Sequence, residues 1–370
     1  MNIFYYHNLD LTFKSAQTIQ VIKDYYYLSK NGCNVFLYGL YRDKNDLKEI
    51  KEYLQNSQNI YLNHKKRSKL NKIFLKLKII KDILFSNSKI FIVIRHYKNF
   101  KVPFILKKLT KSKIVLEMHE ESIPHLLKKN RKNLKQKFLN IIKKIDILIF
   151  TNFSQKELFF KEFQNFSPKH MILPNGVEIE RFKNITKGDS YTITYIGQFN
   201  KWKNVELIFE SMQYLPKKYK LKIAGGKNDK DSKSFIKEMI EKYQLKDRVK
   251  FFGYITNQKI PDFIDRSSAL LLPLGDNIQS KYLTSPMKLF EYMATKIPIV
   301  AVNYPSINKI VNNEIYLAKN DPKDFALKIE EAANNYDINK TKKMNRLAQK
   351  FSYKNRAKKF YKFLKQSYKK

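Results

Sequence analysis

The sequence predicts an α/β protein built from two doubly wound domains. Strand-like and helix-like segments alternate along the chain, which is typical of a parallel sheet covered by helices on both faces. The alternation restarts after a polar segment at residues 183–190, so we expect domains at residues 1–182 and 183–345, followed by a basic helix at residues 346–370. A chain of 370 residues is too long for one ordinary core, which agrees with two domains.

The expected first domain begins with a strand at residues 3–7 and a helix at residues 16–30. Asn31 and Gly32 follow this helix and would end it as a C-cap. Further strand candidates are short, apolar and rich in β-branched residues, and they lie at residues 35–38, 59–62, 90–94, 114–118 and 145–150.

The expected second domain repeats the same alternation. Strand candidates lie at residues 191–196, 221–224, 249–252 and 269–272, and helix candidates lie at residues 204–214, 232–243 and 260–266. Glycines are scarce, with nine in the chain, yet these strands are followed by Gly197, Gly225, Gly226, Gly253 and Gly275. Glycine suits any tight turn, but several at one sheet edge favour a crevice where backbone approaches a ligand.

Residues 284–303 predict a loop, a short helix and a strand buried on both faces. Ser285 suits the N-cap and Pro286 the first helical position, so the first turn would offer backbone N–H groups to an anion. Glu291 follows among apolar residues. A carboxylate behind such an anion site can accept hydrogen bonds from the vicinal hydroxyls of a ribose, which predicts nucleotide binding.

The chain is strongly basic, with a formal net charge of +40. The lysine excess is concentrated at residues 65–81, 128–144 and 340–370, and the first two stretches interleave lysine with Leu, Ile and Phe as surface-seeking amphipathic helices do. An AT-rich genome would also produce this composition. A basic surface could serve an anionic membrane, phosphorylated substrates or nucleic acid, and our hypothesis is peripheral membrane contact.

Several classes of protein are disfavoured. No apolar run approaches the roughly 18 to 20 residues of a spanning helix, and residues 1–6 look like a strand and not a signal peptide. We therefore expect a cytoplasmic protein, with peripheral contact at the inner face of the cytoplasmic membrane. Cys33, the single cysteine, excludes an internal disulfide and a cysteine metal cluster. Phosphate-loop, HExxH, GxSxG and GxGxxG motifs are absent from the sequence.

Four segments of the second domain carry a family resemblance. Residues 195–204, 221–226, 249–253 and 285–294, in this order, resemble the donor-binding domain of family four glycosyltransferases, and residues 173–178 with Arg181 and Phe182 resemble the segment between their domains. The resemblance implies a GT-B fold, with two Rossmann-like domains facing across a cleft and a C-terminal helix that crosses back to the first domain. It also implies retaining transfer from a nucleotide diphosphate sugar, with no cofactor and no obligatory metal.

The resemblance assigns donor-binding roles to Gly197, Gln198, Lys203, Gly225, Pro273, Ser285, Pro286, Met287, Lys288 and Glu291. Lys203 would hold the donor diphosphate; the alternative is a solvated lysine at a helix start. Gln198 stands where the family commonly has arginine, so Lys203 would act alone or with Lys288. Lys288 could contact phosphate or form an ion pair with Glu291, three residues further on.

The loop before Glu291 departs from the family pattern. Glu291 matches the second glutamate of the E-x7-E signature, but the first would fall at Leu283, which cannot hydrogen-bond a sugar. Two explanations stay open. Backbone amides near residues 285–287 and Lys288, in the SP-x-K form of this loop, could supply the contacts; or the chain has lost activity.

On the first domain the resemblance places His119, at a strand end, near the transferred sugar; a satisfied structural histidine is the alternative. The predicted catalytic residues are therefore His119, Glu291 and Lys203, and the predicted acceptor-side residues are Ser15, Gln17, His96 and Asn175. The family's glycine-rich first loop is replaced by residues 14–18.

The resulting expectation is a retaining hexosyltransferase that acts on a bacterial surface glycan, such as lipopolysaccharide or capsule, or on a lipid-linked acceptor. The alternative is a catalytically silent GT-B protein that binds nucleotide or glycan or scaffolds a partner enzyme. Nucleic acid is not an expected partner, because Tyr and Phe mostly fall at helical spacing beside Leu and Ile, which favours core positions over base stacking.

Overall fold

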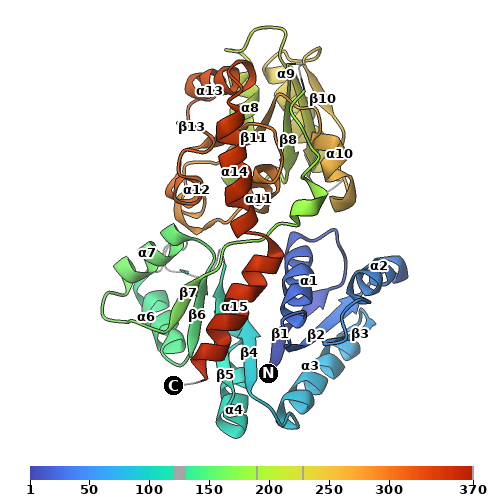
Figure 1. Cartoon of the computed structure of the whole chain (residues 1–370), viewed down its shortest axis with the longest axis vertical. Coiled ribbons are helices and arrows are strands. Elements are labelled where there is room, and N and C mark those ends of the chain that lie inside the picture. The colour runs from blue at the N-terminus through green and yellow to red at the C-terminus, as the bar shows by residue number, and fades with distance from the viewer. Residues whose placement is uncertain (120–122, 124–130, 189–190, 227–228, 369–370) are drawn as a thin grey trace. The chain divides into compact units, whose positions relative to one another are not determined.

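The computed structural model describes residues 1–119, 123, 131–188, 191–226 and 229–368 (Figure 1). The chain forms two compact units, one of residues 1–176 with 353–370 and one of residues 177–352. The units therefore divide after Gly176 and Ser352, and not after residues 182 and 345 as predicted. Val177, Ile179 and Phe182 explain the first difference, because their side chains are buried in the core of the second unit.

The first unit contains a parallel sheet with strand order β3-β2-β1-β4-β5-β6-β7 in the described residues. The strands are β1 (Asn2–Asp10), β2 (Asn34–Tyr41), β3 (Ile60–Lys66), β4 (Ile90–Ile94), β5 (Lys113–Met118), β6 (Ile147–Phe150) and β7 (His170–Ile172). The helices between them are α1 (Ala16–Ser29), α2 (Lys44–Leu54), α3 (Lys69–Leu84), α4 (Lys101–Thr110), α6 (Arg131–Ile142) and α7 (Phe153–Glu162), with a 3-10 turn, η1 (Tyr97–Asn99).

The predicted strands of this unit are all present, and several are longer than the apolar pattern suggested. β1 and β2 extend beyond their apolar cores because they pair with each other in parallel to Asp10 and Leu40. The basic stretch at 65–81 is not one helix, since Lys65 and Lys66 end β3. β7, three half-buried residues long, was not predicted. Residues 128–130 of the second basic stretch lie outside the described residues.

The chain's last helix, α15 (Tyr353–Ser367), packs against α1 in the first unit (Figure 1). This confirms the predicted return of the C-terminal helix to the first domain. The predicted single helix over 346–370 is wrong, however, because residues 346–350 end a separate helix, α14 (Ile338–Lys350), which packs on the second unit. The lysine-rich stretch at residues 340–370 is thus divided between the two units.

The second unit has the strand order β10-β9-β8-β11-β12-β13 in the described residues, again parallel. The strands are β8 (Thr192–Gly197), β9 (Lys220–Gly225), β10 (Val249–Phe251), β11 (Ala269–Leu272), β12 (Ile299–Val302) and β13 (Tyr316–Ala318). The helices are α8 (Glu206–Ser211), α9 (Lys230–Lys242), α10 (Ile260–Ile264), α11 (Met287–Met293), α12 (Pro305–Val311), α13 (Pro322–Asn334) and α14, and the short turns are η3 (Ile179–Arg181), η4 (Lys201–Lys203), η5 (Asn257–Lys259) and η6 (Gln279–Leu283).

Residues 284–303 fold as predicted, into a loop, the helix α11 and the strand β12. All four residues of β12 are buried, because α-helices and neighbouring strands enclose it. In both sheets the first strand, β1 or β8, lies at the centre, and the strand order reverses beside it. Such a reversal opens a crevice at the carboxyl ends of the strands, where ligands bind in open α/β sheets.

The described helices were compared with the requirements of a membrane-spanning helix. None of the described helices combines the length and the apolar character needed to cross a bilayer.

Candidate functional site

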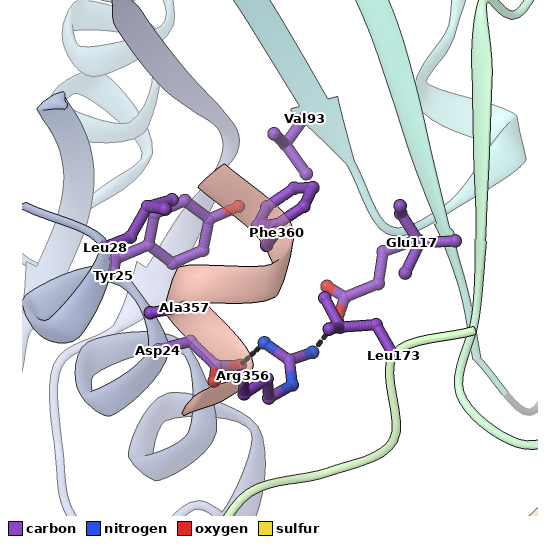
Figure 2. A pocket seen from close by; sticks show the side chains of 10 residues that line it. Asp24, Tyr25, Leu28, Val93, Glu117, Leu173, Arg356, Ala357 and Phe360 are labelled. Carbon is purple, nitrogen blue, oxygen red and sulfur yellow. Dashed lines mark hydrogen bonds and ion pairs between the residues drawn. The ribbon is translucent and has the colours of Figure 1, made fainter. Parts of the chain in front are cut away.

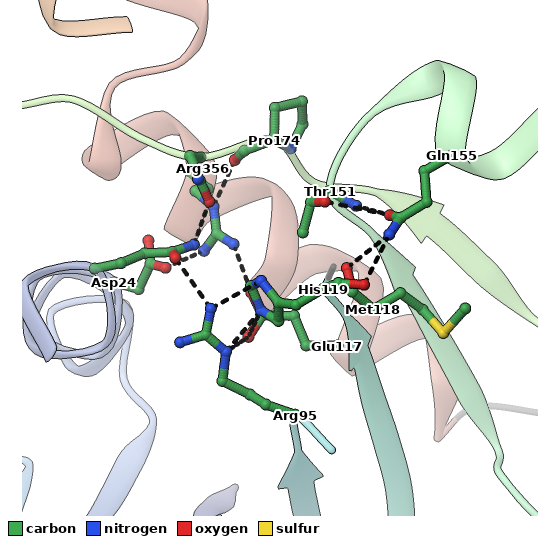
Figure 3. Close-up of polar contacts among 11 residues, drawn as sticks. Asp24, Arg95, Glu117, Met118, His119, Thr151, Gln155, Pro174 and Arg356 are labelled. Atoms are coloured by element: carbon green, nitrogen blue, oxygen red, sulfur yellow. Dashed lines mark hydrogen bonds and ion pairs between the residues drawn. The ribbon is translucent and has the colours of Figure 1, made fainter. Parts of the chain in front are cut away.

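His119 directly follows β5 and belongs to a buried polar cluster in the first unit (Figure 3). The Nε of Arg95 donates to the Nε2 of His119 at 2.6 Å, and the Nη2 of Arg95 lies 2.9 Å from Nδ1. Burial and Arg95 lower the pKa of His119 to about 4, although Glu117 opposes the shift. The imidazole is therefore neutral near pH 7.

Glu117 lies in β5, two residues before His119, and faces the same cluster. Burial favours its neutral form, but His119, Arg95 and Arg356 together hold the pKa of this carboxyl well below its usual range. Its Oε2 is 3.3 Å from the Nε2 of His119 and 3.6 Å from the Nε of Arg95. Glu117 is thus a permanent anion that compensates two buried guanidinium groups.

Arg356 of α15 is the member of this cluster that sequence reasoning missed. Its Nη2 donates to Glu117 at 3.1 Å, its Nη1 to Asp24 of α1 at 2.7 Å, and its Nε to the carbonyl of Pro174 at 2.8 Å (Figure 3). Arginine suits such multiple contacts better than lysine. Glu117 is 239 positions away, however, so no local pattern in the sequence links the two.

The cavity beside Arg356 is too small for a substrate. It is lined by Asp24, Tyr25, Leu28, Val93, Glu117, Ile149, Leu173, Arg356, Ala357 and Phe360 (Figure 2), and its volume is about 10 Å³. That is space for a single water at most. Burial here raises the pKa of Asp24 to about 7, with Arg356 opposing. The cavity is a packing gap under α15.

The predicted acceptor-side residues fall into two groups. Ser15, the N-cap of α1, and Gln17 both line a pocket of about 830 Å³ at the carboxyl end of β1. His96 lies beside this pocket, with its ring centroid 5.9 Å from that of His7, a lining residue. Asn175 is buried and accepts a hydrogen bond from Gln20, whose carbonyl oxygen accepts one from Arg95 at 3.1 Å. Asn175 is therefore connected to the His119 cluster and not to the pocket.

In the second unit, glycines shape the carboxyl edge of the sheet. Gly197 ends β8 and pairs with Gly225 at the end of β9. Gly225 has φ +131°, and a Cβ added there would lie 1.8 Å from the carbonyl oxygen of Gly197. Gly226 donates to that same oxygen at 3.0 Å. The two strand ends approach so closely that only glycine fits at position 225.

Lys203 ends the η4 turn that follows β8, and its Nζ lies 5.3 Å from the ring centroid of Trp202. The carbonyl of Trp202 accepts hydrogen bonds from Gly275 N–H at 2.9 Å and from Ser280 Oγ at 2.7 Å. These bonds hold the Lys203 turn against the segment after β11. Gln198 stands between β8 and this turn, and its carbonyl accepts a hydrogen bond from Tyr195 at 2.8 Å.

The start of α11 differs from the prediction. Pro286, and not Ser285, is the N-cap, and no side chain caps this end. The helix begins at Met287 because Pro286 has an extended ψ of 121°, which is incompatible with the first helical position. Ser285 and Met287 are partly exposed beside it, and Pro273 is buried just after β11.

Glu291 and Lys288 form the ion pair that was one of the two alternatives for Lys288. The Nζ of Lys288 lies 2.5 Å from the Oε2 of Glu291, and the side chains are 19% and 6% exposed. α11 also contacts β8, because Ile196 N–H donates to the Oη of Tyr292 at 3.3 Å. Glu291 is therefore carried by a helix fixed to the strand that ends at Gly197. Leu283, at the end of η6, is buried.

Metal binding has no evident ligand set in the described residues, since no group of three or more His, Cys, Asp or Glu side chains among them could hold an ion. The absence of an obligatory metal stays a prediction.

Residues 176–351 match the family model described as glycosyl transferases group 1. One curated relative, an uncharacterized glycosyltransferase of Methanocaldococcus jannaschii, is 26% identical over 196 residues, which cover 51% of this chain and 52% of that protein. The match therefore spans about half the length of this relative.

Solved structures match over nearly the whole chain. HepE of Anabaena in complex with UDP and glucose has a TM-score of 0.74 at 12% identity, covering 99% of this chain and 100% of that chain. Sucrose-phosphate synthase from Thermosynechococcus elongatus has a TM-score of 0.73 at 16% identity, with 99% and 98% covered. A glycosyltransferase from Rickettsia africae has a TM-score of 0.73 at 17% identity, covering 100% of this chain and 98% of that chain. At these identities the likeness shows the fold, and it confirms the predicted GT-B fold.

Proposed function

We propose that the chain transfers a sugar from a nucleotide diphosphate sugar to an acceptor hydroxyl, because residues 176–351 match the model of the group 1 glycosyl transferases. The observation that carries the proposal is the assembly of the glycine edge, the Lys203 turn and the Glu291 helix at one end of the second sheet. HepE, of the same fold, has been solved with UDP-glucose, which supports a nucleotide sugar as donor.

In this proposal the second unit binds the donor. Glu291 accepts hydrogen bonds from the ribose hydroxyls, and Lys203 neutralises the charge that builds on the departing nucleotide diphosphate. Lys288, paired with Glu291 in the structure, would have to exchange that partner for phosphate before it could assist. The neutral imidazole of His119 would have to exchange one of its two contacts with Arg95 for a hydroxyl of the transferred sugar.

The finer parts of the proposal rest on the family resemblance. We propose a hexose as the transferred sugar, retention of its anomeric configuration, and no need for a metal. For the acceptor we propose a bacterial surface glycan, as in lipopolysaccharide or capsule, or its lipid-linked precursor.

Donor binding is the first step to test. Thermal shift with a panel of nucleotide sugars should identify the donor, and we expect Glu291→Ala and Lys203→Ala each to abolish the shift. Lys201→Ala, which changes an exposed lysine in the same turn, is the matched control and should retain it. Unchanged shifts in both site variants would show that the donor site lies elsewhere.

Peripheral membrane contact through α3 and α4 is a further part of the proposal. Large apolar side chains on these neighbouring helices are exposed: Leu70, Ile73, Phe74, Leu77, Leu84, Ile105 and Leu109. Lysines flank them, and each basic residue near an anionic leaflet contributes about 1 kcal/mol. Co-sedimentation with anionic vesicles should therefore decrease when salt is added and in the variant Leu70→Ser/Leu77→Ser. Binding that depends on neither anionic lipid nor these leucines would exclude membrane contact through α3 and α4.

A catalytically silent protein is the second candidate, because Leu283 is buried where the family signature has a glutamate. It predicts saturable nucleotide binding with neither hydrolysis nor transfer of any sugar in the panel. Release of nucleoside diphosphate in the presence of an acceptor would exclude this candidate.

A further inference from the structure

We propose that the pocket at the carboxyl end of β1 binds the phosphate or diphosphate group of an anionic acceptor; this inference rests on the proposed transferase function. The pocket has a volume of about 830 Å³ and lies between β1, the start of α1, α3 and the η1–α4 segment. In strand order, β1 is where the first sheet reverses. The pocket thus occupies the crevice where open α/β sheets bind ligands.

Cations dominate the lining of this pocket. They come from two stretches of the chain, residues 67–76 and 98–101, and comprise Arg67, Lys69, Lys72, Lys76, Lys98 and Lys101. Asp10 is the acidic lining residue in the described part of the chain. Arg67 is paired with Asp10 at 3.2 Å. Lys69, Lys72, Lys76 and Lys101 lie within ion-pair distance of no carboxylate among the described residues. The pocket therefore carries a net positive charge that protein carboxylates do not balance.

The start of α3 adds to this charge. Ser68 caps the helix by accepting from Asn71 N–H at 3.0 Å, and both Ser68 and Lys69 line the pocket. The helix has 16 residues, so its N-terminal dipole favours an anion at this end. Asn8 of β1 donates to the carbonyl of Lys72 at 3.3 Å, which fixes α3 to the central strand.

The environment of His7 is consistent with a positive pocket. Burial, with contributions from His96, Arg95 and Lys72, lowers the pKa of His7 to about 4. A neutral His7 beside Ser15 and Gln17 gives the pocket uncharged hydrogen-bonding groups next to its cations. Hydroxyls of a sugar and the oxygens of a phosphoryl group could therefore be bound side by side.

α3 has two chemically different faces, and this narrows the class of acceptor. Lys69, Lys72 and Lys76 line the pocket, whereas Leu70, Ile73 and Leu77 of the same helix are 80%, 55% and 61% exposed. A ligand with a phosphoryl group and an apolar chain can contact both. The shared chemistry is the phosphoryl group, which a lipid-linked diphosphate or a soluble sugar phosphate could supply.

Calorimetric titration tests the site with two probes, inorganic pyrophosphate and a short-chain prenyl diphosphate. The full-length Lys203→Ala variant serves as the background, because it removes the proposed diphosphate contact of the donor site. We expect saturable binding of both probes at physiological salt. Lys72→Ala/Lys76→Ala should weaken it at least about tenfold, because two charge-assisted contacts are lost. The matched control, Lys44→Ala/Lys81→Ala, removes two exposed lysines outside the pocket and should leave binding unchanged.

The outcomes separate the possible sources of the phosphoryl group. Tighter binding of the prenyl probe than of pyrophosphate supports a lipid-linked acceptor, and equal binding supports a soluble phosphate. Absence of saturable binding, or equal weakening in the control, overturns the proposal.

Failure of this site and failure of the proposed function remain distinguishable. Thermal shift with nucleotide sugars tests the donor site separately, in protein that retains Lys203. In that protein we expect Lys72→Ala/Lys76→Ala to leave the thermal shift unchanged. If the donor binds and pyrophosphate does not, the pocket assignment is wrong. If pyrophosphate binds and no nucleotide sugar does, the transferase proposal is wrong.

Discussion

The strand ends of the two sheets are organised by different means. At the end of β5, side chains determine the arrangement, since the neutral His119 and the charged Glu117, Arg95 and Arg356 contact one another in a largely buried network (Figure 3). At the end of β8 the backbone defines the shape, through Gly197, Gly225 and the carbonyl of Trp202. The first arrangement stabilises the fold at considerable desolvation cost, and the second leaves room for a ligand to approach the backbone.

If this contrast is correct, the largest effect on stability comes from Arg356. Arg356→Ala leaves Glu117 and Asp24 buried without their guanidinium partner, so we expect a loss of about 3 to 5 kcal/mol in the free energy of unfolding. Chemical denaturation measures it. Lys358→Ala, an exposed change on the same helix, should stay within about 0.5 kcal/mol; a similar loss in both variants would mean that the helix, and not the network, matters.

The next largest effect concerns His119 and pH. Its folded pKa is about 4 against an ordinary value of 6.5, so the unfolded chain binds more protons between these values. Stability from the neutral imidazole is complete above pH 6.5 and is lost as pH falls towards 4, by up to about 3 kcal/mol. Besides burial, the charges of Arg95 and Arg356 lower the pKa of His119, and Glu117 raises it.

The measurement is the difference in unfolding free energy between the parent and His119→Asn at several pH values. Asp24, with a pKa raised to about 7, has the opposite slope, because the folded state then binds more protons. It titrates in both proteins, so the difference isolates His119. A difference that does not shrink from pH 7 to pH 4 would contradict a His119 side chain that is neutral in the folded protein.

A smaller effect should distinguish two glycines of the second unit. Gly225→Ala places a Cβ 1.8 Å from a carbonyl oxygen at a φ of +131°, whereas Gly253, with φ +67°, has nothing within 4 Å of an added Cβ. We expect Gly225→Ala to cost more than about 2 kcal/mol and to weaken nucleotide-sugar binding, and Gly253→Ala to cost about 1 kcal/mol. Equal costs would show that the close approach at β8 and β9 is not needed.

Local pattern was sufficient for most of the fold. Apolar, β-branched runs predicted β4 and β11 with their observed bounds and the loop–helix–strand order of residues 284–303. Pattern did not predict β7 and β13, each three residues long, although it did predict β10, which has the same length. It also placed the boundaries between units at the polar segment, although Phe182 is buried in the second core.

The sequence by itself determined two parallel α/β units, the glycines at the strand ends of the second unit and the motif residues Lys203, Glu291 and His119. These features depend on neighbouring residues and on the period of helices and strands. Tertiary structure alone decided that Arg356 joins α15 to Asp24 and Glu117, and that six cations from separate segments meet in one pocket. Such contacts join residues far apart in the chain, and their geometry exists only after the sheet has brought its strand ends together.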